Sequence, residues 1–200
     1  MLTLLEGYRG RKLVRIFRLR PFLNKRTKMT IVTDASPFGM GGFLVYGCVA
    51  IGYFIAAITD HDRKVLEVID DERGQQRWEA LAILIALRMW RSFWMDVRVT
   101  LTVKSDNMSA LTFVNDLRAK GGGLRTIACA LALDLAESSF EPDLAVHTPG
   151  VCNDVADALS RYYDPARARS WQLPPALVNA KRCTPPCRDQ RWWKTLAGLA

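Results

Sequence analysis

The stretch MTIVTDASPFGMGGFLVYGCVAIGYFIAAI, residues 29–58, decides the fold that this sequence predicts. Residues 29–35 are rich in β-branched side chains and predict a strand, and residues 36–42 predict a glycine-rich turn. Two further strands are predicted on either side of a hairpin glycine, at residues 43–46 and 49–58 around Gly47. Three successive strands with short connections favour an antiparallel meander.

The rest of the chain alternates helices with strands. Residues 59–71 are polar and predict a loop, whereas apolar side chains recur at helical spacing over residues 72–94. The later predicted elements are a strand at 97–103, helices at 107–117 and 124–138, a strand at 144–147, and a last helix that ends near Arg161 with Asn153 as its N-cap. We therefore expect an α/β fold, with a mixed five-stranded sheet of three antiparallel strands followed by parallel additions, and with helices on both faces.

Charge divides the 200 residues into three parts. Residues 1–28 carry a net charge of +8 and residues 162–200 carry +5, whereas residues 29–161 carry −5. Basic flanks suit a polyanionic partner, although they also fit segments that only aid solubility. We predict a basic connecting segment (1–28), one folded domain (29–163) and a basic, proline-containing tail (164–200) that is loosely ordered.

Composition narrows the protein class further. No apolar run reaches the roughly 18 residues that a membrane span requires, and the N-terminus lacks the apolar centre of a signal peptide. We expect no membrane contact and an intracellular location, cytoplasmic or nuclear. The five cysteines match no disulfide or zinc spacing, so we expect reduced thiols.

Four carboxylates stand where a sheet edge or a helix could bring them together. Asp34 ends an apolar strand, and Asp106 follows another strand at the equivalent place. Glu79 lies near the start of the helix predicted at 72–94, and its next eight residues are all apolar. Asp157 lies between two alanines in the final helix. Acids gathered at one edge repel each other unless hard cations neutralise them, and oxygen ligands favour Mg²⁺ or Mn²⁺.

Each acid also has a simpler interpretation. Asp34 and Asp106 could cap the segments that follow them. Glu79 could form an ion pair with Arg77 or Lys64, and Asp157 could be an exposed helix residue. Together, however, the four acids favour two divalent ions about 3.5–4 Å apart, which is the arrangement for in-line displacement at phosphorus.

Four segments resemble the ribonuclease H domain of gypsy-like retroelement reverse transcriptases. The similarity spans about residues 29–163 and is concentrated in IVTDASPFGMGG (31–42), RWEALAILIAL (77–87), VKSDNMSAL (103–111) and HTPGVCNDVADALSR (147–161). In the last segment His147 precedes Asp157 by ten positions and Asn153 precedes it by four, as in that family's closing motif. The residues alone do not decide between Asp154 and Asp157; the resemblance selects Asp157.

The resemblance implies a catalytic site of Asp34, Glu79, Asp106 and Asp157 as ligands of two Mg²⁺ or Mn²⁺ ions, with His147 assisting proton transfer or product release. It implies hydrolysis of the RNA strand of RNA–DNA hybrids, with a reverse transcriptase polymerase domain as the partner. Residues 1–28 look like the end of a region that joins polymerase to nuclease, so we expect a piece of a retroelement polyprotein or a decayed copy of one.

Two other functions remain open at this point. The chain could be an inactive ribonuclease H-fold module that binds nucleic acid or serves as a structural domain of a polymerase polyprotein. It could also be a related nuclease such as an integrase or resolvase, although the ADALSR segment (156–161) does not fit those proteins. Without the motif, His147 would be interpreted as an ordinary surface residue.

Overall fold

A computed structural model describes most of the chain. The described residues are 27–68, 71–94, 99–107, 109–112, 121–137, 141–147 and 153–193, and for 71–73, 135–137 and 141–147 the description covers the backbone. The elements in chain order are β1 (Thr27–Ser36), β2 (Gly39–Tyr46), β3 (Val49–Ala57), α3 (Asp60–Val65), α4 (Asp71–Met89), the 3₁₀ turn η2 (Arg91–Phe93), β4 (Val99–Ser105), α6 (Gly122–Glu137), β5 (Glu141–His147), α7 (Asp154–Ser160), the 3₁₀ turn η4 (Pro175–Leu177) and β6 (Lys181–Arg182).

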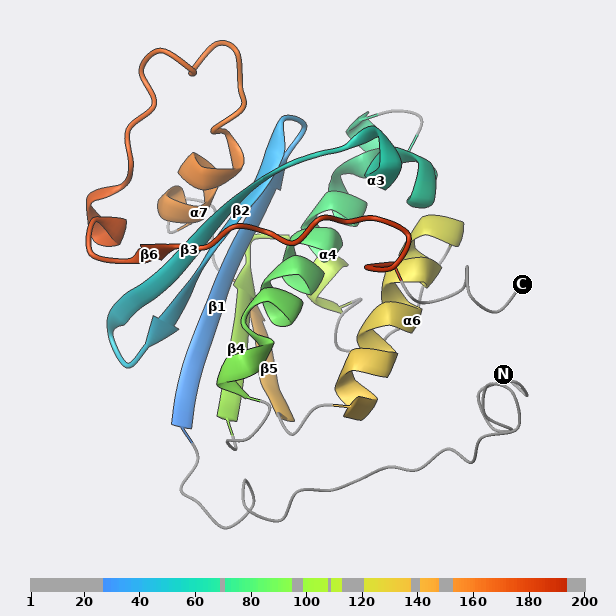
Figure 1. The fold of residues 1–200 in the computed structure, drawn as a ribbon, viewed down its shortest axis with the longest axis horizontal. Helices are drawn as coiled ribbons and strands as arrows, with labels where there is room; N and C mark the ends of the chain where they lie inside the picture. The colour runs from blue at the N-terminus through green and yellow to red at the C-terminus, as the bar shows by residue number, and fades with distance from the viewer. Residues whose placement is uncertain are drawn as a thin grey trace.

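The strands form one mixed sheet in the order β5-β4-β1-β2-β3-β6 (Figure 1). β1, β2 and β3 pair in antiparallel fashion, β4 adds to β1 in parallel, and β5 adds to β4 in parallel. The predicted five-stranded mixed sheet is therefore confirmed. The two-residue strand β6, which comes from the predicted tail, pairs with β3 in parallel and extends the sheet by a short sixth strand.

Helices lie on both faces of the sheet, as predicted. α4 and α6 pack together on one face, and α7 contacts β1, β2 and β3 from the other (Figure 1). The alternation along β3 explains the division, because Phe54 joins the main core on the α4 side while Tyr53 and Ile55 join a smaller cluster with Leu159 of α7. The α4 segment from Ala80 to Leu87 is buried throughout, as expected for a helix between a sheet and a second helix.

The glycine-rich segment 36–42 is not the turn that the sequence predicted. The turn consists of Pro37 and Phe38, and the hydroxyl of Ser36 closes it by accepting hydrogen bonds from the backbone N–H groups of Phe38 (3.2 Å) and Gly39 (3.3 Å). The glycines lie in β2, where α7 packs directly on the strand. A Cβ at Gly41 would lie 2.3 Å from Cβ of Leu159, so only glycine lets the helix approach this closely.

The predicted loop at 59–71 contains a short helix, α3. Thr59 and Asp62 form a capping box, in which each side chain accepts a hydrogen bond from the other residue's backbone N–H. The Thr-x-x-Asp spacing is a helix-start signal that the polar composition concealed. The helix positions Asp62 as a fully buried carboxylate beneath the tail.

The C-terminal segment is not loosely ordered over its described part, residues 164–193, which wraps around the sheet edge and crosses the helical face (Figure 1). Arg188 binds the buried carboxylate of Asp62 through Nε and Nη2 at 2.8–3.0 Å, and Nη2 also donates to the carbonyl of Ala57. The ring of Trp193 joins the main core, and Arg88 stacks over the ring of Trp192. Apolar side chains spaced through a proline-rich sequence thus hold the tail on the domain.

Some predictions fall wholly or partly outside the described residues. These are the connecting segment up to residue 26, most of the predicted helix at 107–117, and Cys152. The other four cysteines are all free thiols, in agreement with the expectation for them. Within the described part of the chain, no helix is long and apolar enough to cross a membrane.

Candidate active site

Asp34 lies in β1 on the side that faces α7. It is 4% exposed, and its two carboxylate oxygens accept hydrogen bonds from Ser160 Oγ at 2.6 Å and Asn153 Nδ2 at 3.3 Å. Its strand partner is Gly41, the glycine on which α7 rests. Asp34 is therefore a buried side chain held by the ends of α7, and the alternative that it caps a following segment is not what the structure shows.

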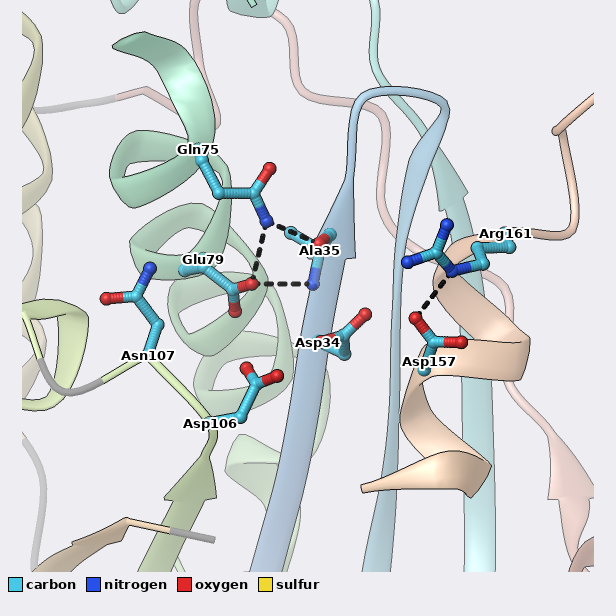
Figure 2. A pocket seen from close by; sticks show the side chains of 8 residues that line it. All are labelled: Asp34, Ala35, Gln75, Glu79, Asp106, Asn107, Asp157 and Arg161. Atoms are coloured by element: carbon cyan, nitrogen blue, oxygen red, sulfur yellow. Dashed lines mark hydrogen bonds and ion pairs between the residues drawn. The ribbon is translucent and has the colours of Figure 1, made fainter. Parts of the chain in front are cut away.

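Glu79 reaches the end of β1 from α4. Its Oε1 accepts hydrogen bonds from the backbone N–H of Ala35 at 3.1 Å and from Gln75 Nε2 at 3.0 Å, and its Oε2 accepts one from Ser105 Oγ at 3.3 Å. Gln75 also donates to the carbonyl of Ala35 at 2.6 Å, which ties the helix to the strand (Figure 2). Arg77, the alternative ion-pair partner considered for Glu79, donates instead to the carbonyl of Glu67.

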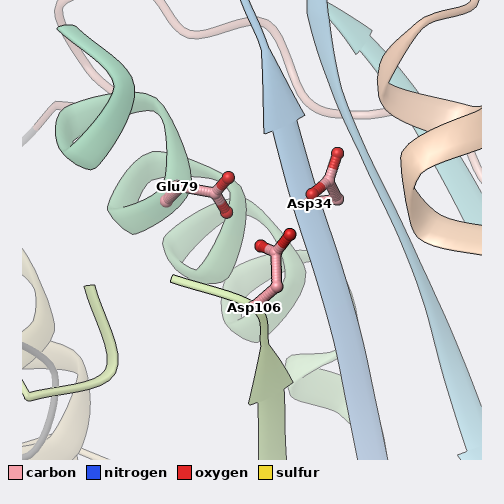
Figure 3. Close-up of side chains that lie close together, drawn as sticks. All are labelled: Asp34, Glu79 and Asp106. Carbon is pink, nitrogen blue, oxygen red and sulfur yellow. The ribbon is translucent and has the colours of Figure 1, made fainter. Parts of the chain in front are cut away.

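Asp106 completes the cluster from the residue after β4. Because β4 runs parallel to β1, the carboxyl ends of the two strands meet at one edge of the sheet. One carboxylate oxygen from each of Asp34, Glu79 and Asp106 lies within 4.8 Å of the others, and the three side chains point toward one another (Figure 3). Asp106 is the most open of the three.

Burial, and then the proximity of these acids, raises two of their pKa values. Burial, and then the charges of Asp106 and Asp157, raise the pKa of Asp34 from 3.8 to about 7, against the hydrogen bond from Ser160, which lowers it. Burial, and then the charges of Asp34 and Asp106, raise the pKa of Glu79 well above its ordinary value of 4.5. Without a cation, the site is therefore electrostatically strained in its fully ionised form.

Asp157 lies across β1 from Glu79 and Asp106, on α7 (Figure 2). It lines the same cavity of about 400 Å³, whose walls are formed by Asp34, Ala35, Gln75, Glu79, Asp106, Asn107, Asp157 and Arg161. It is not a member of the close cluster of three, and its carboxylate is bound by Arg161 and lies near Arg167. The structure thus brings all four predicted acids to one cavity, and three of them have oxygens within 4.8 Å of one another.

His147 is the last residue of β5, as it is of the strand predicted at 144–147. In the parallel register of β4 and β5 it lies opposite Ser105, the residue before Asp106. The backbone therefore places His147 at the same sheet edge as the carboxylates, and its role stays a prediction.

Several residues that hold the site were not assigned to it from the sequence. Ser160 and Asn153 bind Asp34, and Ser105 and Gln75 bind Glu79. Gln75 could have been found, because it precedes Glu79 by four positions and so lies on the same face of α4. Asn153 occupies the predicted N-cap position of α7, but it makes no side-chain cap hydrogen bond, and its amide is directed to Asp34.

The donor set fits divalent cations. All the converging groups are carboxylates, two of them buried, and their mutual repulsion is the feature that a hard cation relieves. Oxygen-only ligands of this kind suit Mg²⁺ or Mn²⁺ better than Zn²⁺, which prefers nitrogen and sulfur.

Comparison with solved structures identifies the fold. LC11 ribonuclease H1, isolated from compost by a metagenomic approach, is 19% identical, with 72% of this chain and 99% of that chain covered at a TM-score of 0.50. Ribonuclease H1 from the halophilic archaeon Halobacterium salinarum NRC-1 is 17% identical (70% and 97% covered, TM-score 0.48). The N-terminal ribonuclease H domain of a Mycobacterium tuberculosis protein is 14% identical (72% and 98% covered, TM-score 0.46).

No protein-family model matches the chain, and neither does any curated protein. The strand order and the likeness to LC11 ribonuclease H1 together show that the chain has a ribonuclease H-like fold.

Proposed function

We propose that this chain is a metal-dependent endonuclease that hydrolyses the RNA strand of RNA–DNA hybrids. The observation that carries the proposal is the convergence of Asp34, Glu79 and Asp106, from three separate elements, within 4.8 Å at one open cavity. A ribonuclease H-like fold with this cluster at a sheet edge supports phosphodiester hydrolysis, and the likeness to LC11 ribonuclease H1 supports a hybrid as the substrate.

The chain's own residues would hold and orient the reacting groups. Asp34, Glu79, Asp106 and Asp157 are the proposed ligands of two Mg²⁺ or Mn²⁺ ions. Bound ions of this kind supply an activated water and stabilise the leaving oxygen. Glu79 enters this role with a fixed orientation, because Ala35, Gln75 and Ser105 together bind both of its oxygens. Asp34 is oriented in the same way by Ser160 and Asn153.

His147 is the proposed proton-transfer or product-release residue, on the basis of its position ten residues before Asp157. Its backbone lies beside the end of β4. We also propose that the domain belongs to a retroelement reverse transcriptase, with a polymerase domain as its partner, because the His147-to-Asp157 segment has the spacing of gypsy-like elements.

The decisive experiment incubates the full chain with a labelled RNA–DNA hybrid, duplex DNA, and single-stranded RNA and DNA, each with Mg²⁺ and with EDTA. Cleavage of the RNA strand of the hybrid alone, dependent on Mg²⁺, is the expected result. Hybrid binding without cleavage in any metal would favour the inactive module, and cleavage of duplex DNA would favour a related nuclease of another class.

A matched pair of variants tests the choice of the fourth ligand. Asp154 and Asp157 are both in the first turn of α7, and Asp154 is exposed. We expect Asp157→Asn to abolish cleavage and Asp154→Asn to leave it within about twofold, because exposed charges of this kind contribute little. The opposite ranking would reassign the ligand.

A further inference from the structure

The carboxylate of Asp157 is engaged by two arginines at the rim of the cavity. Arg161 Nε donates to Asp157 Oδ1 at 2.5 Å, and Arg167 Nη1 lies 3.8 Å from Asp157 Oδ2. The side chain of Arg161 is 35% exposed, that of Arg167 is 53% exposed, and that of Asp157 is 37% exposed. Each carboxylate oxygen thus faces its own guanidinium, in a place that solvent and ligands reach.

Hydrogen bonds hold the backbone segments that carry both arginines. Arg161 is the C-cap residue of α7, and its backbone N–H donates to the carbonyl of Asp157. Arg167 follows a turn in which its backbone N–H donates to the carbonyl of Asp164 at 3.0 Å, and its Nε lies 3.9 Å from that residue's carboxylate. Trp171 Nε1 donates to the carbonyl of Ala158 at 2.6 Å, which fastens the segment after this turn to α7.

The contact of Asp157 with the two arginines is weak enough for another anion to replace the Asp157 carboxylate. Part-exposed ion pairs contribute about 0–1 kcal/mol, so a competing anion can replace Asp157 at small cost. An arginine pair that spans two oxygens also matches the geometry of a phosphate, which accepts parallel N–H donors. If Asp157 acts as a ligand of divalent cations, Arg161 loses the carboxylate that it binds and Arg167 keeps only that of Asp164. A nucleic-acid strand supplies a replacement anion at every nucleotide.

We propose that Arg161 and Arg167 form a phosphate-binding pair for the nucleic-acid strand, and that Asp157 occupies this pair as an internal anion until a substrate phosphate displaces it. The proposal rests on the proposed function, and it deepens it by assigning a substrate contact on the α7 side of the cavity. The exchange frees both oxygens of Asp157 for their proposed role as ligands.

The first test measures equilibrium binding rather than activity. The full chain is titrated into a fluorescently labelled RNA–DNA hybrid in EDTA, where no cleavage is expected, over a series of salt concentrations. Arg161→Gln and Arg167→Gln should each weaken binding by roughly tenfold, the lower end for a charged hydrogen bond at a part-exposed site. Each should also reduce the slope of log K against log salt by about one unit.

Arg169→Gln is the matched control, because Arg169 is an exposed arginine two residues after Arg167. We expect it to change affinity by no more than about twofold, as for a surface charge without a phosphate contact. A loss equal to that of Arg167→Gln would mean that the segment acts only through diffuse charge, and it would overturn the assignment of a specific pair. Thermal unfolding of each variant checks that the fold is retained.

The second test asks whether Asp157 competes with the substrate for the arginines. In EDTA, Asp157→Asn should strengthen hybrid binding, and this gain should disappear when Arg161 and Arg167 are both glutamine. Asp106→Asn also removes a negative charge from the cavity, but its gain should be the same in both backgrounds. Equal gains for Asp157→Asn in both backgrounds would refute the exchange.

The outcomes separate this inference from the proposed function. Cleavage of the hybrid by the unaltered chain, together with unchanged binding by Arg161→Gln and Arg167→Gln, would overturn the phosphate-binding pair alone. An unaltered chain that neither binds nor cleaves the hybrid would overturn both.

Discussion

Replacing Asp34 by asparagine should abolish cleavage and, at the same time, stabilise the metal-free protein. The side chains are nearly the same size, and the surroundings can accept the change. The asparagine Oδ1 can still accept the hydrogen bond from Asn153, and the hydroxyl of Ser160 can turn from donor to acceptor for the new amide group. The loss is a charged ligand, and the gain is relief from burying a charge beside other carboxylates.

The magnitude follows from the pKa of Asp34, which burial and then the charges of Asp106 and Asp157 raise from 3.8 to about 7. A raised pKa means that the folded state binds this proton more tightly than the unfolded state, so stability falls as the pH rises from 3.8 to about 7. At about 1.4 kcal/mol per pKa unit, ionised Asp34 costs about 4 kcal/mol above pH 7. Asparagine escapes this cost, which corresponds to a melting temperature about 10 °C higher.

The assay is unfolding of both proteins in EDTA at several pH values. The stability difference should be small near pH 4, widen through the interval between the two pKa values, and level off above pH 7. Added Mg²⁺ should then stabilise the unaltered protein more than the variant, because ligand binding to the native state raises stability. A lower melting temperature for metal-free Asp34→Asn at pH 8 would refute this reasoning, and it would mean that Asp34 is an anchor for Ser160 and Asn153.

The remaining predictions concern the metal, the basic flank, the histidine and the helix contact. Exhaustive chelation should abolish cleavage, and Ca²⁺ should restore little of it because its coordination is looser than that of Mg²⁺; full activity in EDTA would exclude the metal mechanism. Deleting residues 1–28 should make the salt dependence of hybrid binding shallower, since nine cations are removed, and an unchanged slope would show that the flank does not contact nucleic acid. His147→Ala should lower single-turnover rates by roughly 100-fold or less while Mg²⁺ dependence is kept, and a loss as complete as that of Asp34→Asn would contradict the assigned role. Gly41→Ala should cost about 1–3 kcal/mol of stability because its Cβ would collide with Leu159, whereas normal stability in a denaturant titration would show that α7 can move away freely.

Much of the fold could be predicted because local patterns and tertiary packing agree. The strand at 29–35, the hairpin at Gly47 and the long apolar helix before Trp90 each carry a strong local signal. The turn predicted around Gly39 and Gly41 was wrong because a glycine-rich run ordinarily indicates a turn. Here the glycines let a helix pack closely on the strand, although that helix is more than a hundred positions away in sequence. Such a contact has no trace in the local pattern.

The candidate site, too, could be predicted only in part from the sequence. Asp34 and Asp106 could be paired from strand ends, and the buried helix suggested Glu79. The ion pair of Asp157 with Arg161 could have been suggested by their i,i+4 spacing. The contact of Arg167 with Asp157 could not be inferred, because the turn that presents Arg167 is defined only by the folded tail. The tail itself was misjudged, because proline content hid the apolar and charged side chains that hold it in place.

The contact between Arg188 and Asp62 also sets the order in which this domain can be completed during synthesis. The two residues are 126 positions apart, and at about 5–20 residues per second a ribosome needs roughly 6–25 seconds to make the intervening chain. During that interval the nascent domain exposes the outer edge of β3 and has no arginine for the Asp62 carboxylate. A newly made chain therefore leaves this edge unpaired until Lys181 and Arg182 emerge, and a ribosome that stalls before Lys181 would release a sheet with an open edge, which is prone to aggregate.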